Sequence, residues 1–190
     1  MILLASASPR RRELLAQIGV AHRAEAVDID ETPRPDEPVE ALVCRLARDK
    51  ARALAACSGT AQPVLGADTL ISLDGQPLGK PADRDAGLAM LARLSGRTHE
   101  VHTAVALIHA GREAVRLNRS RVQLRELTPA EQAAYWATGE PADKAGGYAI
   151  QGRAAMFVSR LEGSYTGVMG LPLYETAELL REFGVALLQP

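Results

Sequence analysis

The sequence has few cysteines, few aromatic residues and almost no net charge. Only two of its 190 residues are cysteine, 4% are aromatic, and the formal net charge is −1. So small a charge argues against general nucleic-acid binding, because such proteins carry a basic balance or a basic face. The sequence also lacks a run of about 18 apolar residues, so no membrane-spanning helix is predicted. We therefore expect neither a stable complex with nucleic acid nor insertion into a membrane.

The two cysteines, Cys44 and Cys57, lie in one expected helix over residues 38–57. Their spacing along that helix is about 20 Å, whereas a disulfide needs Cα atoms within about 7 Å of each other. Free thiols are typical of a reducing compartment. The N-terminal apolar run is too short for a secretory signal, and basic residues follow it rather than precede it. A transit peptide is the alternative, which the early acid Glu13 disfavours, so we expect a cytoplasmic protein.

Motifs of several common reactions are missing from the sequence. The patterns G-x-x-x-x-G-K-[ST], G-x-G-x-x-G and G-x-S-x-G do not occur, and neither cysteine lies in a recognisable motif. His99 and His102 form an H-x-x-H pair inside a strand-like run, where residues three apart face opposite sides. Nucleophilic catalysis by Ser or Cys and hydrolysis at a zinc ion are therefore disfavoured.

Predicted strands and helices alternate along the chain. Strands are expected at residues 2–5, within 63–81 (with a hairpin turning at Asp74-Gly75), at 99–110 and at 113–127; Val27 and Ile29 alternate with acids and read as strand-like. Helices are expected at 9–18, 38–57, 83–94 and 172–183, with a capping-box helix from Thr128 to about Gly139. This alternation predicts an α/β fold, and the hairpins predict a mixed sheet.

The segment "LLASASPRRRELLAQIG" places three arginines at the start of a helix, after Ser8 as N-cap and Pro9 as first helical residue. The helix macrodipole disfavours positive charge at this end. Arg11 heads the apolar stripe of this helix, and Arg10 lies beside it. Free backbone N–H groups with two inward guanidinium groups predict an anion site suited to phosphate. A solvated basic face is the alternative.

Lys50 interrupts the apolar stripe of the 38–57 helix, four residues after Leu46 and three before Ala53. A lysine in this position either buries its stem and keeps its charge in water, or points into a cleft that receives a ligand of opposite charge. The spacing alone favours neither interpretation.

Two acids stand where strands are expected to end. Glu31 follows the strand-like "VDID", and Asp68 ends the apolar run "PVLGA". Carboxylates at strand ends of α/β proteins commonly line the functional crevice. Lys80 lies in the loop after the hairpin. Several cations with a few carboxylates fit a metal-bound polyphosphate, because Mg²⁺ takes few protein carboxylates and leaves other positions to water and phosphate.

Six blocks of the sequence resemble the Maf proteins, also called septum-formation inhibitor Maf, which are nucleoside triphosphate pyrophosphatases. The blocks are "LLASASPRRRELL" (3–15), "DETPRPDE" (30–37), "RLARDKA" (45–51), "GADTLISLDGQPLGKP" (66–81), "GGYAIQG" (146–152) and "LEGSYTGVMGLPL" (161–173). They occur in the family's order and extend over nearly the whole chain.

The resemblance implies a single domain over residues 1–190, with an elongated α/β fold like that of the inosine triphosphate pyrophosphatases and two lobes around a central cleft. It also implies cleavage of the α–β phosphoanhydride, giving a nucleoside monophosphate and pyrophosphate, with a divalent cation, Mg²⁺ or Mn²⁺. Asp68 matches the family's general base, and Glu31 its second acid; we expect both to hold the metal. The phosphate-facing basic positions match Arg10, Arg11, Lys50 and Lys80.

Substrate preference follows from Arg10, Thr69 and Gln151, which match the subgroup that resembles dTTP and UTP pyrophosphatases. A Gln amide both donates and accepts, which suits the O4 and N3–H edge of uracil or thymine. The alternatives are a 7-methyl-GTP pyrophosphatase or a non-enzymatic inhibitor of septum formation that binds a partner. Modified pyrimidine nucleotides are further candidate substrates, and a homodimer is left open.

Overall fold

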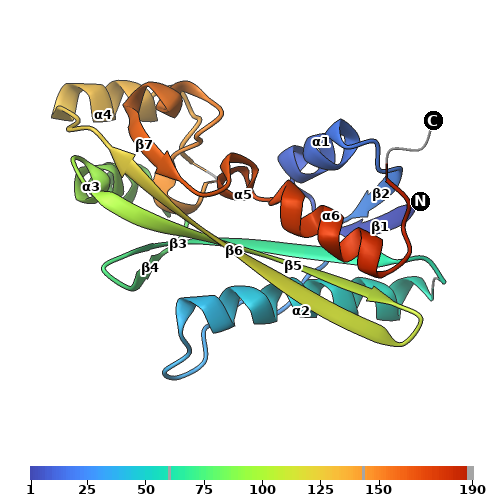
Figure 1. Cartoon of the computed structure of the whole chain (residues 1–190). Coiled ribbons are helices and arrows are strands. Elements are labelled where there is room, and N and C mark those ends of the chain that lie inside the picture. The colour runs from blue at the N-terminus through green and yellow to red at the C-terminus, as the bar shows by residue number, and fades with distance from the viewer. Residues whose placement is uncertain (60, 143, 188–190) are drawn as a thin grey trace.

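A mixed β-sheet runs the length of the molecule and carries helices on both faces (Figure 1). The computed structural model describes residues 1–59, 61–142 and 144–187. The strands are β1 (Ile2–Ala5), β2 (His22–Glu25), β3 (Val64–Leu73), β4 (Gln76–Leu78), β5 (Thr98–His109), β6 (Arg112–Leu124) and β7 (Val158–Glu162). The α-helices are α1 (Pro9–Gln17), α2 (Val39–Ser58), α3 (Arg84–Leu94), α4 (Pro129–Trp136), α5 (Tyr165–Met169) and α6 (Leu173–Glu182). Short 3₁₀ helices are η1 (Ala145–Gly147) and η2 (Arg153–Phe157).

The sheet joins a parallel part to an antiparallel part. Its order is β2-β1-β3-β5-β6-β7, with β4 paired to β3. Strand β1 is parallel to β2 and β3. The pairs β3–β5, β5–β6 and β6–β7 are antiparallel. The α/β class and the mixed sheet expected from the sequence are confirmed.

Each face of the sheet has its own core. Ala47 and Ala51 of α2 pack against Val64 and Ala104 on one face. The opposite face has one cluster beneath α1 and α6 and another between α3, α4 and β7. These two groups of elements lie at opposite ends of the long β5–β6 hairpin, which gives the molecule its elongated form (Figure 1). The two ends agree with the two expected lobes, while the assignment of residues 1–190 to one domain stays a prediction.

Strand β3 has an edge that its neighbours cover only in part. Residues 64–66 pair with β1, and residues 71–73 pair with β4 on the same side. Between them, residues 67–70 pair only with β5 among the described strands. This interval is the point where the two ends of the molecule meet along β3, and Asp68 and Thr69 lie in it.

The predicted strand-like stretch at residues 27–30 is wrong. Pairing with β1 uses His22–Glu25, in register from Ile2↔His22 to Ala5↔Glu25. Because β1 ends at Ala5, residues 27–30 have no strand beside them to pair with, and they carry no regular structure. The partly buried Val27 instead packs against the core beneath α2.

Acid should weaken the fold through His99, which lies in the core with its Nε2 2.7 Å from the Tyr148 hydroxyl oxygen. Burial lowers the pKa of His99 from 6.5 to about 4. Above pH 6.5, His99 is neutral in both the folded and the unfolded protein. Below pH 6.5, His99 takes up a proton in the unfolded chain, whereas in the folded protein it stays neutral down to about pH 4. We expect the free energy of unfolding, measured in urea at pH 7 and 4.5, to fall by about 2 kcal/mol less in His99→Gln than in wild type.

The matched control is His109→Gln, at the partly exposed end of β5. It should lose stability on acidification as wild type does. Equal losses in His99→Gln and wild type would assign the acid sensitivity to other groups.

The described part of the chain contains no helix with the length and apolar character needed to cross a membrane.

Candidate active site

Asp68 lies in the middle of β3, with its side chain only 9% exposed. The prediction that Asp68 ends its strand is therefore wrong, because β3 continues to Leu73. The strand that does end here is β1, whose Ala5 is paired with Gly66. The carboxyl end of β1 thus leaves the adjacent edge of β3 open next to Asp68. The crevice expected at strand ends is formed by β1 rather than by β3.

Lys50 of α2 joins the two predicted acids. Its Nζ lies 2.5 Å from Asp68 Oδ1 and 2.7 Å from Glu31 Oε1, and its side chain is 13% exposed. The charge therefore points at the carboxylates and not into solvent, which excludes the alternative in which only the stem is buried. Helical spacing placed this lysine in the apolar stripe but left both interpretations open, and its contacts decide between them.

Glu31 reaches the site from the loop between β2 and α2. The hydrogen bond from Lys50 lowers its pKa, burial opposes that effect, and the charges of Lys50, Lys80 and Arg11 lower the pKa further. Glu31 is therefore a carboxylate at neutral pH. Because the charges of Lys80 and Arg11 affect the pKa of Glu31, both cations lie within electrostatic range of this carboxylate.

Arg11 lies inward from α1, as its place in the helix predicted. Its Nε donates to the Gly170 carbonyl at 2.8 Å, Nη1 to Ser6 Oγ at 3.2 Å, and Nη2 to Thr69 Oγ1 at 3.1 Å. All these acceptors are neutral, and in the part of the chain that the structure describes no carboxylate is within ion-pair distance. Burial lowers the pKa of the guanidinium, and nearby Asp68 partly offsets this effect. Among the described residues, the site thus holds a partly desolvated positive charge without an anionic partner in contact.

The other predicted residues lie at varying distance from this cluster. Thr69 links Arg11 to Thr103, whose hydroxyl donates to Thr69 Oγ1 at 3.1 Å. Arg10 is half-buried, and its charge acts on Arg11. Lys80 and Gln151 are exposed, and among residues 1–59, 61–142 and 144–187 neither makes a hydrogen bond or an ion pair. Direct contacts therefore bring together Lys50, Asp68 and Glu31, and separately Arg11 and Thr69.

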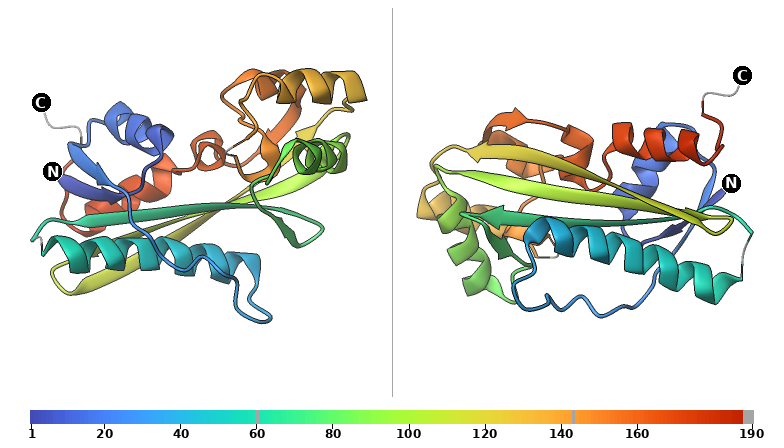
Figure 2. Two further views of the ribbon diagram at one scale, coloured as in Figure 1. Left: turned by 180° about the vertical axis from the view of Figure 1, so that it is seen from behind. Right: turned by 60° about the horizontal axis from the view of Figure 1, so that its bottom comes forward.

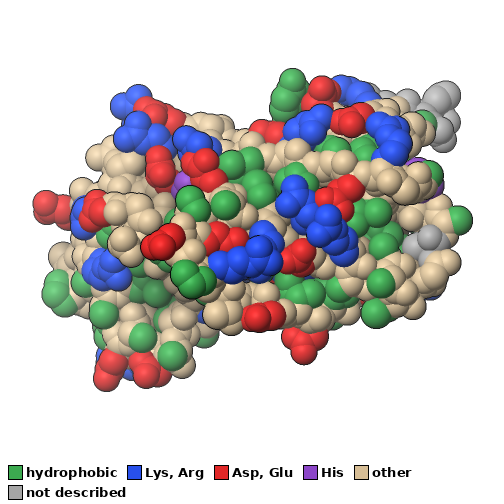
Figure 3. Space-filling view, turned by 90° about the horizontal axis from the view of Figure 1, so that it is seen from below, with side chains coloured by type: hydrophobic (Ala, Val, Ile, Leu, Met, Phe, Trp, Pro, Cys, Tyr) green, Lys and Arg blue, Asp and Glu red, His purple; other side chains and the backbone are tan. Residues whose placement is uncertain are grey.

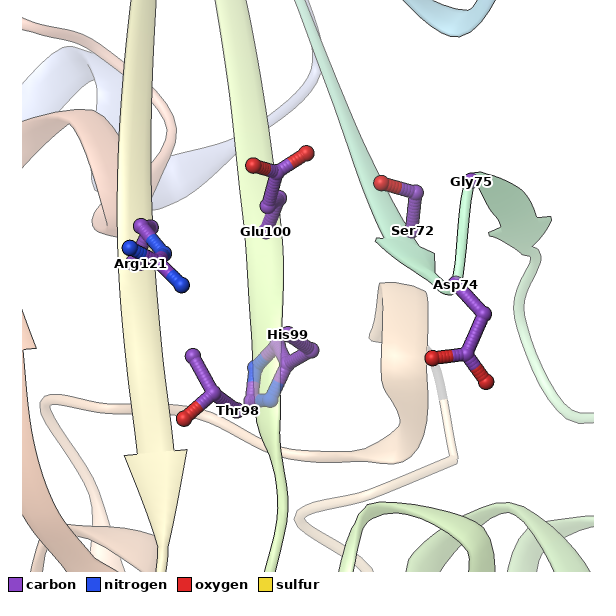
Figure 4. A pocket seen from close by; sticks show the side chains of 7 residues that line it. All are labelled: Ser72, Asp74, Gly75, Thr98, His99, Glu100 and Arg121. Carbon is purple, nitrogen blue, oxygen red and sulfur yellow. The ribbon is translucent and has the colours of Figure 1, made fainter.

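A cavity of about 290 Å³ lies elsewhere, at the far part of β3 and β5. Figure 4 shows Ser72, Glu100 and Arg121 beside it, together with Asp74 of the β3–β4 turn. Ser72 is four residues beyond Asp68, about 13 Å along the strand. None of the predicted site residues lines this cavity, so it does not belong to the cluster around Lys50.

Sequence reasoning missed two contacts of Arg11. Ser6 stands in the loop after β1, and Gly170 stands 159 residues away in the segment "GSYTGVMGLP". That segment lies within the last of the six blocks that resemble the family. The segment contains the short helix α5, and the Gly170 carbonyl contacts Arg11 rather than solvent. No local pattern could have paired positions so far apart.

The two acids of the site carry oxygen atoms of the type that a hard cation takes as ligands. In the described ranges, no group of three or more His, Cys, Asp and Glu side chains is arranged to hold a metal ion. Glu31 and Asp68 nevertheless place carboxylate oxygens against one nitrogen, Lys50 Nζ. Two such oxygens fit Mg²⁺ or Mn²⁺ when water and phosphate oxygens complete the coordination.

Paired carboxylates and a partly buried arginine at a sheet edge give this α/β protein groups suited to a metal-bound phosphate ligand. Residues 1–183 match the family model described as Maf-like protein, and the chain belongs to this family. The expected family is confirmed.

Several relatives with assigned names are similar over nearly their whole length. The chain is 56% identical over 189 residues to the dTTP/UTP pyrophosphatase of Alkalilimnicola ehrlichii, covering 97% of this chain and 93% of that protein. It is 53% identical to the dTTP/UTP pyrophosphatase of Aromatoleum aromaticum, covering 98% and 97%. Among solved structures, the Ham1 protein of Staphylococcus aureus aligns over 96% of both chains, with a TM-score of 0.49 and 13% identity.

Proposed function

We propose that this protein is a nucleoside triphosphate pyrophosphatase that hydrolyses dTTP and UTP to the monophosphate and pyrophosphate. The observation that carries the proposal is the partly buried guanidinium of Arg11, which in the described part of the chain donates only to neutral acceptors, beside the Lys50–Asp68–Glu31 cluster. A desolvated cation is stabilised when an anion binds, and the planar guanidinium suits phosphate oxygens.

The relatives support the substrate class. Proteins more than 50% identical over nearly the whole chain carry the name dTTP/UTP pyrophosphatase. We extend this name to the present chain because Arg10, Thr69 and Gln151 follow the pattern of that subgroup. The face covered by α2 carries interspersed acidic and basic side chains (Figure 3), which does not favour nucleic acid as the ligand of that face.

Each residue of the cluster has a role in the proposed reaction. Asp68 accepts a proton from the attacking water, and Lys50 holds Asp68 and Glu31 in a fixed relative position. Arg10, Arg11, Lys50 and Lys80 offset the charge of the triphosphate and of the departing pyrophosphate. Thr69 fixes the guanidinium of Arg11 through its hydroxyl.

A divalent cation completes the proposed site, held by Glu31 and Asp68. When bound, Mg²⁺ or Mn²⁺ would polarise the phosphate oxygens and neutralise their charge. Lys50 Nζ contacts the same two carboxylates in the structure. A bound cation must therefore displace Lys50 from part of these contacts or share the carboxylates with it.

The test is pyrophosphate release from dTTP, UTP, CTP, GTP and 7-methyl-GTP, with Mg²⁺, with Mn²⁺ and with EDTA. We expect release from dTTP and UTP that EDTA abolishes and either metal restores. Release from 7-methyl-GTP alone would overturn the substrate assignment. No release from any nucleotide would overturn the enzymatic function.

Gln151 stands in a turn that α4 and the residues after it hold in place. Glu140 accepts the Arg153 backbone N–H at 3.0 Å and the Tyr135 hydroxyl at 2.6 Å. The Tyr135 oxygen in turn accepts the Ala149 N–H at 3.1 Å. These bonds fix both sides of the turn that carries Gln151, which supports a role in reading the base.

Gln151→Glu should weaken pyrimidine recognition, because a carboxylate cannot donate a hydrogen bond to O4 of uracil. We expect kcat/KM for UTP to fall by about 10- to 100-fold, corresponding to one unpaired polar contact. Steady-state kinetics with UTP and 7-methyl-GTP measure the change. Gln123→Glu, on an exposed position of β6, is the control. Unchanged UTP kinetics in Gln151→Glu would remove Gln151 from base recognition.

The cysteines bear on where the protein acts. Cys44 and Cys57 are both free. Free thiols support a reducing compartment, so a cytoplasmic location remains our prediction. A homodimer also stays open, and sedimentation of the purified protein would decide it.

A further inference from the structure

Glu31 is a site residue that its own secondary structure does not fix. It lies in the segment between β2 and α2, whose residues 26–38 form no helix or strand. Its side chain is 59% exposed, and its ion pair is with Lys50. Figure 2 shows this segment running alongside α2 before the chain enters the helix. Something other than the sheet must hold the segment in place.

Arg45 of α2 makes that connection. Its Nη2 donates to the carbonyl of Thr32, the residue after Glu31, at 3.0 Å. Its Nε and Nη2 also donate to the two carboxylate oxygens of Glu37, at 2.7 and 2.8 Å. Glu37 itself accepts the backbone N–H of Arg34 at 3.0 Å. One guanidinium thus fastens both ends of segment 32–37 to the helix.

This ion pair differs from the others on the surface. The side chains of Arg45 and Glu37 are 12% and 9% exposed. In the ion pair between Arg52, also on α2, and Glu113 the side chains are 58% and 26% exposed. Shielding and two-point geometry make such a pair stronger and less sensitive to salt than an exposed pair. The hydrogen bonds from Arg45 and from the Arg34 backbone lower the pKa of Glu37 to about 2. The contact therefore persists throughout the pH range in which an enzyme works.

The fastened segment and Lys50 are held by one rigid element, helix α2. Arg45 and Lys50 are five residues apart on α2, a rise of about 7.5 Å. Arg45 holds Thr32, and Lys50 contacts the adjacent Glu31. The Thr32 backbone N–H also donates to Asp30 Oδ1 at 2.9 Å, which closes a tight turn around Glu31.

We propose that Arg45 and Glu37 are positioning residues that set the place of the Glu31 carboxylate beside Lys50 and Asp68. The proposal rests on the proposed function for the role of Glu31. Loss of Arg45 releases the segment, so the second carboxylate leaves its place while Asp68, Lys50 and Arg11 keep theirs.

A double-mutant cycle separates positioning from general stability. We expect Arg45→Gln to lower kcat for UTP by about 10-fold or more, as for other residues that orient a ligand group. In a Glu31→Gln background, Arg45→Gln should lower kcat by less than about 2-fold, because the carboxylate that Arg45 positions is already absent. Glu37→Gln, which keeps one of two acceptor oxygens, should show an intermediate loss. Arg52→Gln is the matched control on α2 and should leave kcat unchanged.

A second measurement reports on the segment without using activity. A protease specific for glutamate can cut after Glu31, and we expect cleavage there to accelerate by about 10-fold in Arg45→Gln, since a segment must open to be cut. Equal losses of kcat with and without Glu31, or cleavage as slow as in wild type, would overturn the proposal. If wild type releases no pyrophosphate from any nucleotide, the proposed function fails, and the cleavage rate alone decides whether Arg45 fixes the segment.

Discussion

Asp68→Asn is expected to lower turnover of dTTP and UTP by a factor of about 10² or more. Asn has the same shape, and its amide oxygen can still accept from Lys50, which lies 2.5 Å from the carboxylate. The amide cannot take a proton from water, and its oxygen is a weaker ligand for a cation. The expected loss is therefore in kcat, with the fold retained. Pyrophosphate release and thermal unfolding of the same preparations measure both.

The matched control is Asp85→Asn, whose side chain is 93% exposed at the start of α3. Its turnover should equal that of wild type. An Asp68→Asn protein that folds normally and turns over UTP at a near-normal rate would remove Asp68 from the roles of base and metal ligand together.

The side chains that sequence predicted best are those on helices. The stripe of α1 placed Arg11 inward, and the stripe of α2 marked Lys50 as a lysine among apolar positions without deciding where its charge points, because the 3.6-residue period is a local property of the chain. Both side chains are enclosed in the structure, with partners on other elements. The sequence could mark them as anomalous, but it could not name those partners.

The acids were located less well, for two different reasons. The sequence placed Asp68 at a strand end, whereas it lies in the middle of β3, beside the end of β1. Which part of the β3 edge is open therefore depends on which strand lies next to β3. Glu31 was placed after a strand that does not form, because β1 is too short to pair beyond Glu25. Both errors concern pairing between segments distant in sequence, which no local pattern contains. The resemblance to known proteins supplied the expected roles of these residues, which stay predictions.

Gly66→Ala is expected to destabilise the fold and to separate Lys50 from Asp68. A Cβ on Gly66 would lie 2.2 Å from the Ala47 carbonyl oxygen and 2.7 Å from the Ala51 backbone nitrogen. Both atoms belong to the backbone of α2, so the helix must move away from β3 to relieve the clash. Overpacking of this kind costs roughly 1–3 kcal/mol or more. That exceeds the gain of up to about 1 kcal/mol from a less flexible unfolded chain.

The displacement also reaches the site, because Gly66 lies two residues before Asp68 and Ala51 directly follows Lys50. Moving α2 outward lengthens the 2.5 Å contact between Lys50 and Asp68, so kcat should fall even at temperatures where the variant remains folded. Urea unfolding gives the loss of stability, and pyrophosphate release below the unfolding transition gives the loss of kcat. Gly79→Ala is the stability control, since a Cβ there meets no atom within 4 Å. A Gly66→Ala protein as stable as the Gly79→Ala protein would show that β3 and α2 can accommodate a methyl group, and the close approach would then not be what places Lys50 against Asp68.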